Sequence, residues 1–322
     1  MDPLKILAPV SEQLSVVEQK LFEFSSNAEL PFLDELLTHA FNSQGKLARP
    51  ALTLLTSGFH EHNWDNVTTM AAAVEMLHIA TLIHDDTVDE AETRRGRITV
   101  SNKYGQHTAV LLGDYIFAAS ATYVCDTGNI QVIRKFSETI MDLSEGQIQE
   151  TANIKNINTD LNEYLHRIFL KTGSLFTTAG ESGAILSGAS DDQVKSITNY
   201  SKNLGLAFQV IDDIFDLNSN ETELGKPVGS DLINGVITLP TLYGMENPDF
   251  KSLIKDFFKD TSDILLHRQI IDYLNQSSSV ERAYDFAKDL IQSSKTSIQS
   301  LPKSDSRDSL VSLCDFIITR KD

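Results

Sequence analysis

Apolar residues recur at spacings of three and four along most of this chain. Two such series are Leu14, Val17, Leu21 and Phe24, and Phe32, Leu36, Leu37 and Ala40. This spacing matches the 3.6-residue period of an amphipathic α-helix. No convincing alternation of Val, Ile and Thr between hairpin turns occurs, and most glycines and prolines fall between the periodic segments. The pattern predicts an all-α protein.

The chain contains no obvious boundary between two domains. No long linker rich in Ser, Gly or Pro divides its 322 residues, and no repeat of solenoid length is present. We therefore expect residues 1–322 to form one large helical bundle. Cys125 and Cys314 lie far apart and form no CxxC pattern, which argues against a disulfide framework and a zinc site. With no convincing signal peptide at the N-terminus, the expected location is the cytoplasm.

The net charge restricts the class of partner. The chain has 27 Lys and Arg against 45 Asp and Glu, a formal charge of −18. This charge opposes attraction to nucleic acid and to anionic lipid, so we expect no nucleic-acid partner. The most membrane-like stretch, residues 107–125, carries Asp114 near its middle. We interpret it as a buried core helix and expect no membrane span.

Two clusters of carboxylates follow apolar helical segments. Residues 67–84 are apolar nearly all round, as in a helix at the centre of a bundle, and the chain then reads DDTVD at 85–89. A second apolar run at 204–208 leads into DDIFD at 212–216. The pattern DDxxD therefore occurs twice. One copy could be a solvated helix end, but two copies in this context make coincidence much less plausible.

The spacing of these carboxylates indicates a site for cations. Positions i and i+4 share one face of a helix, so Asp85 with Asp89, and Asp212 with Asp216, can each present two carboxylates together. Such close carboxylates repel one another unless a cation lies between them. Ligands that are all oxygen favour Mg²⁺, which commonly bridges protein carboxylates and substrate phosphates.

Basic residues gather in short groups near these motifs. The groups are GKLAR at 45–49, RRGR at 94–97, KTGS at 171–174 and GKP at 225–227. Lys and Arg suit phosphate as a point charge and a bidentate fork, respectively. A single basic residue is usually an ordinary surface charge, but their position beside the carboxylate motifs favours binding of a phosphorylated substrate.

The strings GKLARP, HDDTVDEAETRRG, GDYIFA, KTGSLF, FQVIDDIFD and GKPVGSDLINGVITLP resemble, in this order, the trans-type polyprenyl diphosphate synthases. The match covers residues 45–240, which is most of the chain. The resemblance implies an all-helical isoprenoid-synthase fold, usually homodimeric, in which both aspartate motifs face a central cavity. It also implies two substrates, isopentenyl diphosphate and an allylic diphosphate primer. Any contact with a membrane would be transient and would occur during product release.

The resemblance assigns roles to individual residues. The principal ligands of a cluster of three Mg²⁺ ions would be Asp85, Asp89 and Asp212, and the catalytic motifs would be completed by Asp86, Asp213 and Asp216. The allylic diphosphate would be held by Arg94, Lys171, Thr172, Gln209 and Lys226, with the Thr172 carbonyl near the reacting carbons. Isopentenyl diphosphate would be bound by Lys46, Arg49, His78 and Arg95. His78 lies seven residues before Asp85 and so shares its helical face.

The implied reaction is head-to-tail chain elongation. Metals and cations stabilise the departing pyrophosphate, an allylic carbocation forms, and the double bond of isopentenyl diphosphate attacks it before a proton is lost. Two positions depart from the family pattern. Leu47 stands where Arg is common, and Val236 stands where Lys is often found, which removes a possible contact at each diphosphate site.

Product length in this family depends on the residues just before the first DDxxD, where a bulky aromatic closes the pocket. Here these residues are Ala80 and Thr81, which are small. We therefore expect a medium-to-long product of about six to ten isoprene units (C30–C50), with each unit advancing about one helical turn. Larger residues further along are candidates for the end of the pocket: Leu77, Val74, Phe117 and Tyr123.

Other functions compete with this interpretation. A synthase of the twenty-carbon geranylgeranyl product is the nearest alternative, followed by a non-catalytic subunit of a two-chain synthase. A class I terpene cyclase shares the fold but normally needs a different second metal motif, for which Asp216 and Asn220 are the wrong residues. His84 and Asp85, with His60 or His62, also suggest an HD-type metal phosphohydrolase, but that class leaves the second DDxxD unexplained.

Overall fold

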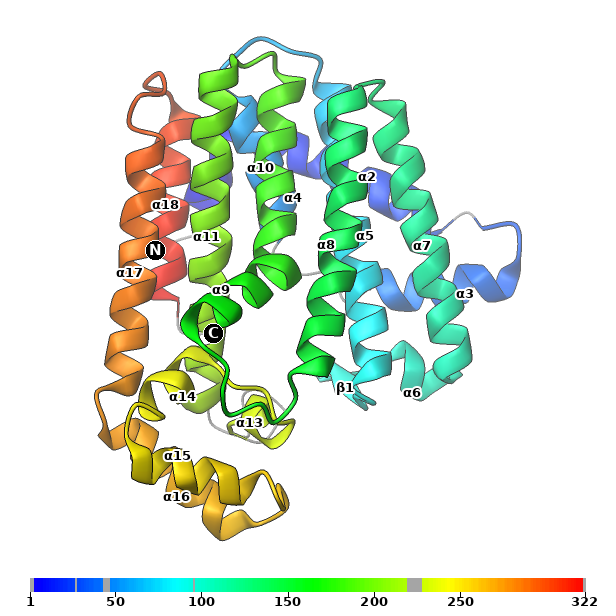
Figure 1. Cartoon of the computed structure of the whole chain (residues 1–322). Coiled ribbons are helices and arrows are strands. Elements are labelled where there is room, and N and C mark those ends of the chain that lie inside the picture. The colour runs from blue at the N-terminus through cyan, green and yellow to red at the C-terminus, as the bar shows by residue number, and fades with distance from the viewer. Residues whose placement is uncertain (1–2, 27, 43–46, 95, 219–227, 321–322) are drawn as a thin grey trace.

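The computed structural model describes the whole chain except residues 1–2, 27, 43–46, 95, 219–227 and 321–322, and it confirms the all-α prediction (Figure 1). Within these residues the only strands are the short pair β1 (Thr93–Arg94) and β2 (Arg97–Ile98). The first half of the bundle consists of α1 (Pro3–Leu7), the 3₁₀ turn η1 (Ala8–Val10), α2 (Ser11–Ser25), α3 (Pro31–Phe41), α4 (Ala48–Ser57), α5 (Trp64–Val88), α6 (Val100–Tyr104), α7 (Gln106–Asp126) and α8 (Ile130–Ala152).

The second half begins with α9 (Leu161–Ile168), the π-helical turn η2 (Phe169–Gly173) and α10 (Ser174–Leu186), which follow one another without a break. The remaining helices are α11 (Asp191–Asn218), α13 (Ser230–Ile233), α14 (Leu239–Gly244), α15 (Pro248–Phe257), α16 (Ile264–Gln276), α17 (Ser279–Ser297) and α18 (Asp305–Thr319). In Figure 1, α17 and α18 flank α11 on one side of the bundle, while α7 lies on the opposite side.

Helix α5 lies at the centre of the core. It packs against α2, α4, α7 and α10, and it is buried on almost every side between Val67 and Ala80. The Asn63 side chain accepts a hydrogen bond from the Asp65 backbone N–H, which satisfies one orphan donor at the start of the helix. The apolar residues thus carry the chain through the core and bring the first DDxxD motif to its far end.

Helix α7 is buried on one face only. Both α5 and α7 are long and apolar enough to cross a membrane by length and composition, but 78% of the most apolar window of α5 is buried against 33% for α7. The sequence predicts a core helix at residues 107–125, and the structure corrects this interpretation for the outward face. Val110, Leu111 and Tyr115 on that face are all exposed.

A smaller apolar cluster is formed largely by side chains of α15 and α16. Its buried residues include Phe250, Ile254 and Phe257. Leu242 and Val280 pack against both this cluster and the main core, so the two are joined by shared side chains. The smaller cluster supports α13, the short helix that follows the second DDxxD motif.

Candidate active site

Both aspartate motifs contribute to one cavity of about 320 Å³. The predicted site residues that line it are Arg49, His78, Thr81, Asp85, Asp89, Arg94, Lys171, Thr172, Gln209 and Asp212. Sequence reasoning missed four further lining residues: Leu82, Leu143, Leu175 and Phe208. The cavity therefore combines carboxylates, cations and an apolar wall, contributed by helices that lie far apart in the sequence.

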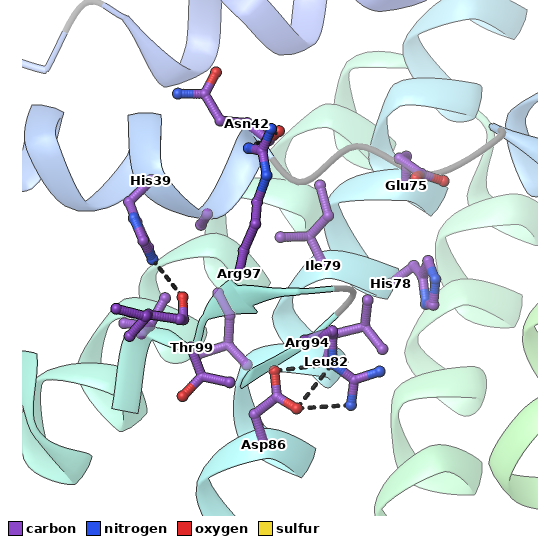
Figure 2. Close-up of a pocket in the computed structure, with 14 residues that line it drawn as sticks. His39, Asn42, Glu75, His78, Ile79, Leu82, Asp86, Arg94, Arg97 and Thr99 are labelled. Atoms are coloured by element: carbon purple, nitrogen blue, oxygen red, sulfur yellow. Dashed lines mark hydrogen bonds and ion pairs between the residues drawn. The ribbon is translucent and has the colours of Figure 1, made fainter. Parts of the chain in front are cut away.

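The first motif divides its carboxylates between two directions. Asp85 lines the cavity, and burial raises its pKa to about 6, an effect that Lys171 opposes and Asp89 reinforces. Asp86 is buried and faces Arg94 instead (Figure 2). Arg94 Nε donates to both carboxylate oxygens of Asp86 at 2.8 and 2.9 Å, and Nη2 lies 2.7 Å from Oδ1. Asp86 thus holds Arg94 at the cavity.

Lys171 is positioned by a π-helical turn and by an unpredicted partner. The turn η2 lies against Gly146 of α8, where an added Cβ would come within 2.8 Å of the Lys171 backbone nitrogen. Lys171 Nζ donates to Glu150 Oε1 at 2.5 Å. Burial lowers the pKa of Lys171, but Glu150 and Asp85 outweigh this effect and raise it, so the ammonium stays charged.

Asp213, the second aspartate of the second motif, belongs to a buried hydrogen-bonded chain. Thr172 Oγ1 donates to Gln209 Oε1 at 2.6 Å, Gln209 Nε2 donates to Asp213 Oδ1 at 2.9 Å, and the Tyr164 hydroxyl donates to Asp213 Oδ2 at 2.6 Å. Burial raises the pKa of Asp213 to about 7, although both hydrogen bonds oppose this. Asp213 therefore organises Gln209 and Thr172 beside the cavity.

The outer residues of the second motif also differ in role. Asp212 lines the cavity and forms an ion pair with Arg320, at the C-terminal end of α18. Asp216 accepts hydrogen bonds from the Ser230 backbone N–H at 3.1 Å, the Ser230 hydroxyl at 2.6 Å and the Asp231 backbone N–H at 3.1 Å. Asp216 thereby fixes the first turn of α13.

An acidic pocket of about 510 Å³ adjoins the central cavity. It shares Asp89, Lys171, Thr172 and Gln209 with that cavity. Asp231 also lines it, and burial, together with Asp216 and Asp213, raises the pKa of this carboxyl. Val236 lines the same pocket. This position often carries Lys in the family that the sequence resembles, and here it places an apolar side chain among the carboxylates.

A second pocket, of about 160 Å³, adjoins the central cavity (Figure 2). His78 and Arg94 line both this pocket and the central cavity. The pocket also includes His39 and Arg97, whose guanidinium donates to the Asn42 carbonyl at 2.5 Å. Three predicted diphosphate ligands, Lys46, Arg95 and Lys226, lie outside the described residues.

The residues predicted to set product length differ in their position relative to the cavity. Thr81 lines the cavity, and its hydroxyl donates to the His78 carbonyl at 2.7 Å. Ala80, Leu77 and Val74 are fully buried in the core and do not line the described cavity. The ring of Phe117 stacks on that of His84, with 5.4 Å between the ring centres, and the ring of Tyr123 packs edge-on against that of Phe24.

The histidines suggested for a phosphohydrolase have other partners. His84 Nε2 lies 3.2 Å from the Val110 carbonyl, while His60 Nε2 lies 3.0 Å from Gln193 Oε1. His62 Nδ1 contacts the His60 carbonyl at 2.7 Å. These contacts hold His84 against α7 and hold His60 and His62 together near Gln193 of α11, and this arrangement does not support the HD-type alternative.

The donor set suits a hard divalent cation shared with a substrate. Among the residues that the structure describes, no three His, Cys, Asp or Glu side chains are grouped as a complete metal site. Asp85, Asp89 and Asp212 nevertheless line one cavity and offer only oxygen ligands, and Lys171 and Arg94 lie beside them. Mg²⁺ commonly takes one or two protein carboxylates and completes its shell with phosphate and water. The residues therefore fit Mg²⁺.

The fold and the paired carboxylate motifs define a helical enzyme class that handles diphosphates. The chain belongs to the polyprenyl synthetase family, whose model matches residues 30–274. It is 36% identical to a prenyl transferase of Synechocystis over 98% of both chains. It is 33% identical to heptaprenyl diphosphate synthase component 2 of Bacillus subtilis over 97% of this chain and 89% of the relative.

The fold is also that of a solved relative. A polyprenyl synthase from Caulobacter crescentus, solved with calcium and isoprenyl diphosphate, superposes with a TM-score of 0.93. It is 26% identical, and the match covers 100% of this chain and 98% of the other. This similarity agrees with the isoprenoid-synthase bundle expected from the sequence.

Proposed function

We propose that this protein is a trans-prenyltransferase that condenses isopentenyl diphosphate with an allylic diphosphate to give an all-trans polyprenyl diphosphate of about C30–C50. The observation that carries the proposal is the single cavity in which Asp85, Asp89 and Asp212 face Lys171 and Arg94 beside an apolar wall. Carboxylates that collect cations, together with fixed positive charges, stabilise a departing pyrophosphate. The apolar wall accommodates the hydrocarbon.

We propose Mg²⁺ as the metal, with three ions when substrate is present. Asp85, Asp89 and Asp212 would hold them, and the ions would withdraw charge from the diphosphate leaving group. The family membership and the calcium-bound relative support a divalent cation. The buried Asp86–Arg94 pair and the support of α13 by Asp216 give these other motif residues positioning roles.

The chain's own residues would divide the remaining work. Lys171, kept charged by Glu150 and Asp85, and Arg94, held by Asp86, would bind the allylic diphosphate together with Gln209 and Lys226. The C–O bond of this substrate breaks and its C1 forms a bond to C4 of isopentenyl diphosphate. A proton then leaves C2 of the isopentenyl unit, and the released pyrophosphate is its proposed acceptor.

The Thr172 carbonyl would stabilise the allylic carbocation as positive charge develops. Lys46, Arg49, His78 and Arg95 would hold isopentenyl diphosphate on the other side. His78 lines both the central cavity and the pocket beside it, as a residue between two substrates would.

A long product is favoured over the twenty-carbon alternative. Thr81 presents a small side chain to the cavity where a large aromatic would close it. The relative from Bacillus subtilis is named for a heptaprenyl product, which lies within the proposed range.

We also propose a homodimer located in the cytoplasm. The outward face of α7 exposes Val110, Leu111 and Tyr115. The ring of Tyr115 stacks on that of Phe24 of α2, with 6.1 Å between the ring centres. Exposed apolar side chains grouped on one helix face are typical of a protein–protein interface. A second copy is the proposed occupant.

Product analysis tests the proposed reaction. Purified protein is incubated with Mg²⁺, labelled isopentenyl diphosphate and farnesyl or geranylgeranyl diphosphate, and extracted products are sized by chromatography. Elongation past C20 is expected, and it should fall at least 100-fold in Asp89→Asn. The matched control Asp192→Asn changes an exposed carboxylate at the start of α11 and should be fully active. Absence of elongation with every primer would refute the proposal.

A further inference from the structure

The acidic pocket contains a cation that no sequence motif marks. Arg167 lines this pocket together with Lys171, Thr172 and Gln209, three of the residues expected to hold the allylic diphosphate. It lies at the end of α9, four residues before Lys171, and both side chains reach the same pocket. A second positive charge is therefore available beside the expected position of the diphosphate.

Arg167 is buried among carboxylates, with only 5% of the residue exposed. The described carboxylates that line the pocket are Asp89, Glu90, Glu150, Asp213 and Asp231, whereas Lys171 and Arg167 are the only cations among its described lining residues. Lys171 already forms an ion pair with Glu150. Burial raises the pKa of Asp213, and the charge of Arg167 opposes that rise. Since a guanidinium stays protonated even when it is buried, Arg167 is a fixed positive charge in this pocket.

One hydrogen bond fixes the position of this guanidinium. Nη2 of Arg167 donates to the Ile237 carbonyl at 2.6 Å, and the guanidinium carbon lies 5.7 Å from the centre of the Tyr164 ring. A guanidinium has five N–H donors, and this bond is the one that it gives to a described acceptor. Its other nitrogens are not sealed from solvent. Donors of Arg167 therefore remain for a ligand.

The neighbour of Ile237 gives this contact its significance. Val236 lines the same pocket and stands where Lys is often found in the family pattern. Arg167 comes from α9, on a different segment of the chain, yet it binds the backbone one residue after this position. The pocket thus receives a cation beside the position at which the usual cation is absent.

We propose that Arg167 binds the allylic diphosphate and supplies the positive charge that is missing at Val236. This inference rests on the proposed function and adds a binding residue to it. Lys171 and Arg167 then hold the diphosphate together, Lys171 as a point charge and Arg167 as a planar fork.

Moving the charge between the two positions tests the proposal. Arg167→Gln should raise the KM for farnesyl diphosphate about tenfold, because a charge-assisted hydrogen bond is lost, and should leave the KM for isopentenyl diphosphate unchanged. Adding Val236→Lys to this variant should recover most of the loss, although it cannot restore the bond to Ile237. Adding Val236→Met, which supplies length without charge, should recover none. Arg134→Gln is the control, since Arg134 is an exposed arginine on α8.

Binding of inorganic pyrophosphate with Mg²⁺, followed by calorimetry, provides a measurement that is independent of turnover. Arg167→Gln should weaken this binding about tenfold. If circular dichroism shows that Arg167→Gln is unfolded, Arg167→Lys decides, because it keeps the charge and lacks the fork. Pyrophosphate binding about threefold weaker than that of the wild type is then expected, and equal binding would overturn the proposal.

The remaining outcomes separate this inference from the proposed function. Unchanged KM and pyrophosphate affinity in a folded Arg167→Gln would overturn the role of Arg167 and leave the reaction intact. A loss that Val236→Lys does not recover, or that Val236→Met recovers equally well, would give Arg167 a structural role instead. If the wild-type protein elongates no primer, the proposed function fails, and pyrophosphate binding alone decides the role of Arg167.

Discussion

The guanidinium of Arg320 forms an ion pair with the carboxylate of Asp212, the first residue of the second DDxxD motif. Arg320 also donates to the Phe208 carbonyl at 3.1 Å and lies 4.0 Å from the centre of the Phe208 ring. Its side chain is only 9% exposed. The end of α18 is thereby attached to a residue that lines the cavity, 108 positions earlier in the chain.

Because this guanidinium shares a carboxylate with the proposed metal site, we expect Arg320→Ala to lower the Mg²⁺ concentration needed for half-maximal activity. A partly exposed ion pair of this kind is worth on the order of 1 kcal/mol, or about fivefold. The Mg²⁺ concentration needed by Arg320→Lys should lie between those of Arg320→Ala and the wild type, because a Lys ammonium keeps the charge but lacks the planar guanidinium fork. Direct binding of Mn²⁺ in the presence of inorganic pyrophosphate, followed by electron paramagnetic resonance, provides a measurement that is independent of turnover.

Arg307→Ala is the control for this experiment. Arg307 lies on the same helix and donates to the Leu301 carbonyl, away from the cavity, so the metal requirement should not change. A higher metal requirement in Arg320→Ala would contradict competition and would indicate that Arg320 supports substrate binding instead.

Glu150 positions Lys171, and its loss should reduce catalysis although it is not a predicted metal ligand. Glu150→Ala removes the acceptor 2.5 Å from Lys171 Nζ and should lower kcat/KM for the allylic substrate about tenfold. Glu150→Gln keeps an oxygen acceptor and should recover part of this loss. The exposed Glu145→Ala on the same helix serves as control. Equal losses in the Ala and Gln variants would contradict a positioning role based on this hydrogen bond.

Tyr164→Phe should destabilise the fold by about 1–3 kcal/mol, because it removes a donor 2.6 Å from the buried carboxyl of Asp213. Burial raises the pKa of Asp213 to about 7, and the Tyr164 hydrogen bond opposes that rise. A raised carboxyl pKa favours the protonated form in the folded state, so Asp213 destabilises the fold progressively as pH rises from about 4 to 7. The loss in Tyr164→Phe should therefore be larger at pH 8 than at pH 5.5.

Urea unfolding at the two pH values measures this effect. Tyr284→Phe is a suitable control, since its hydroxyl donates to the neutral Ile318 carbonyl at 3.1 Å and its loss should cost little at either pH. A Tyr164→Phe effect that is the same at both pH values would contradict the coupling to Asp213.

The sequence predicted the cavity better than it predicted the partners within it. Helical spacing predicted that Asp85 and Asp89 share one face of a helix. That Asp212 of the second motif joins them at one cavity was implied by the family resemblance, and all three residues line that cavity. The same spacing placed Asp216 beside Asp212, yet Asp216 instead fixes α13. That contact joins residues 14 positions apart, and no local period reports it.

The missed residues depend even more on tertiary structure. Glu150 reaches Lys171 across 21 positions, and Leu143 lies at the cavity only because α8 packs on η2 at Gly146. A lone Glu or Leu on an amphipathic helix gives no motif to detect. Likewise, the apolar composition of α7 predicted burial, but composition does not distinguish a core helix from a helix with an exposed apolar face.

Cys314 should be unreactive in the folded protein. Burial raises the pKa of this thiol to about 12, so only about one molecule in 10⁴ carries a thiolate at pH 8. In the variant Cys125→Ser, which removes the exposed cysteine, Ellman's reagent should label Cys314 at least 100-fold faster in guanidinium chloride than in buffer. Fast labelling in buffer would show that α18 opens readily.

The exposed face of α7 provides the last prediction, on the oligomeric state. Leu111 is 55% exposed beside Val110 and Tyr115, and a charge placed there would lose hydration on association without a partner to replace it. Leu111→Glu should therefore shift sedimentation from dimer to monomer while circular dichroism stays unchanged. Ile264→Glu is the control, since Ile264 is 79% exposed at the start of α16, outside this face. A monomeric wild-type protein, or a variant that remains dimeric, would exclude this face as the interface.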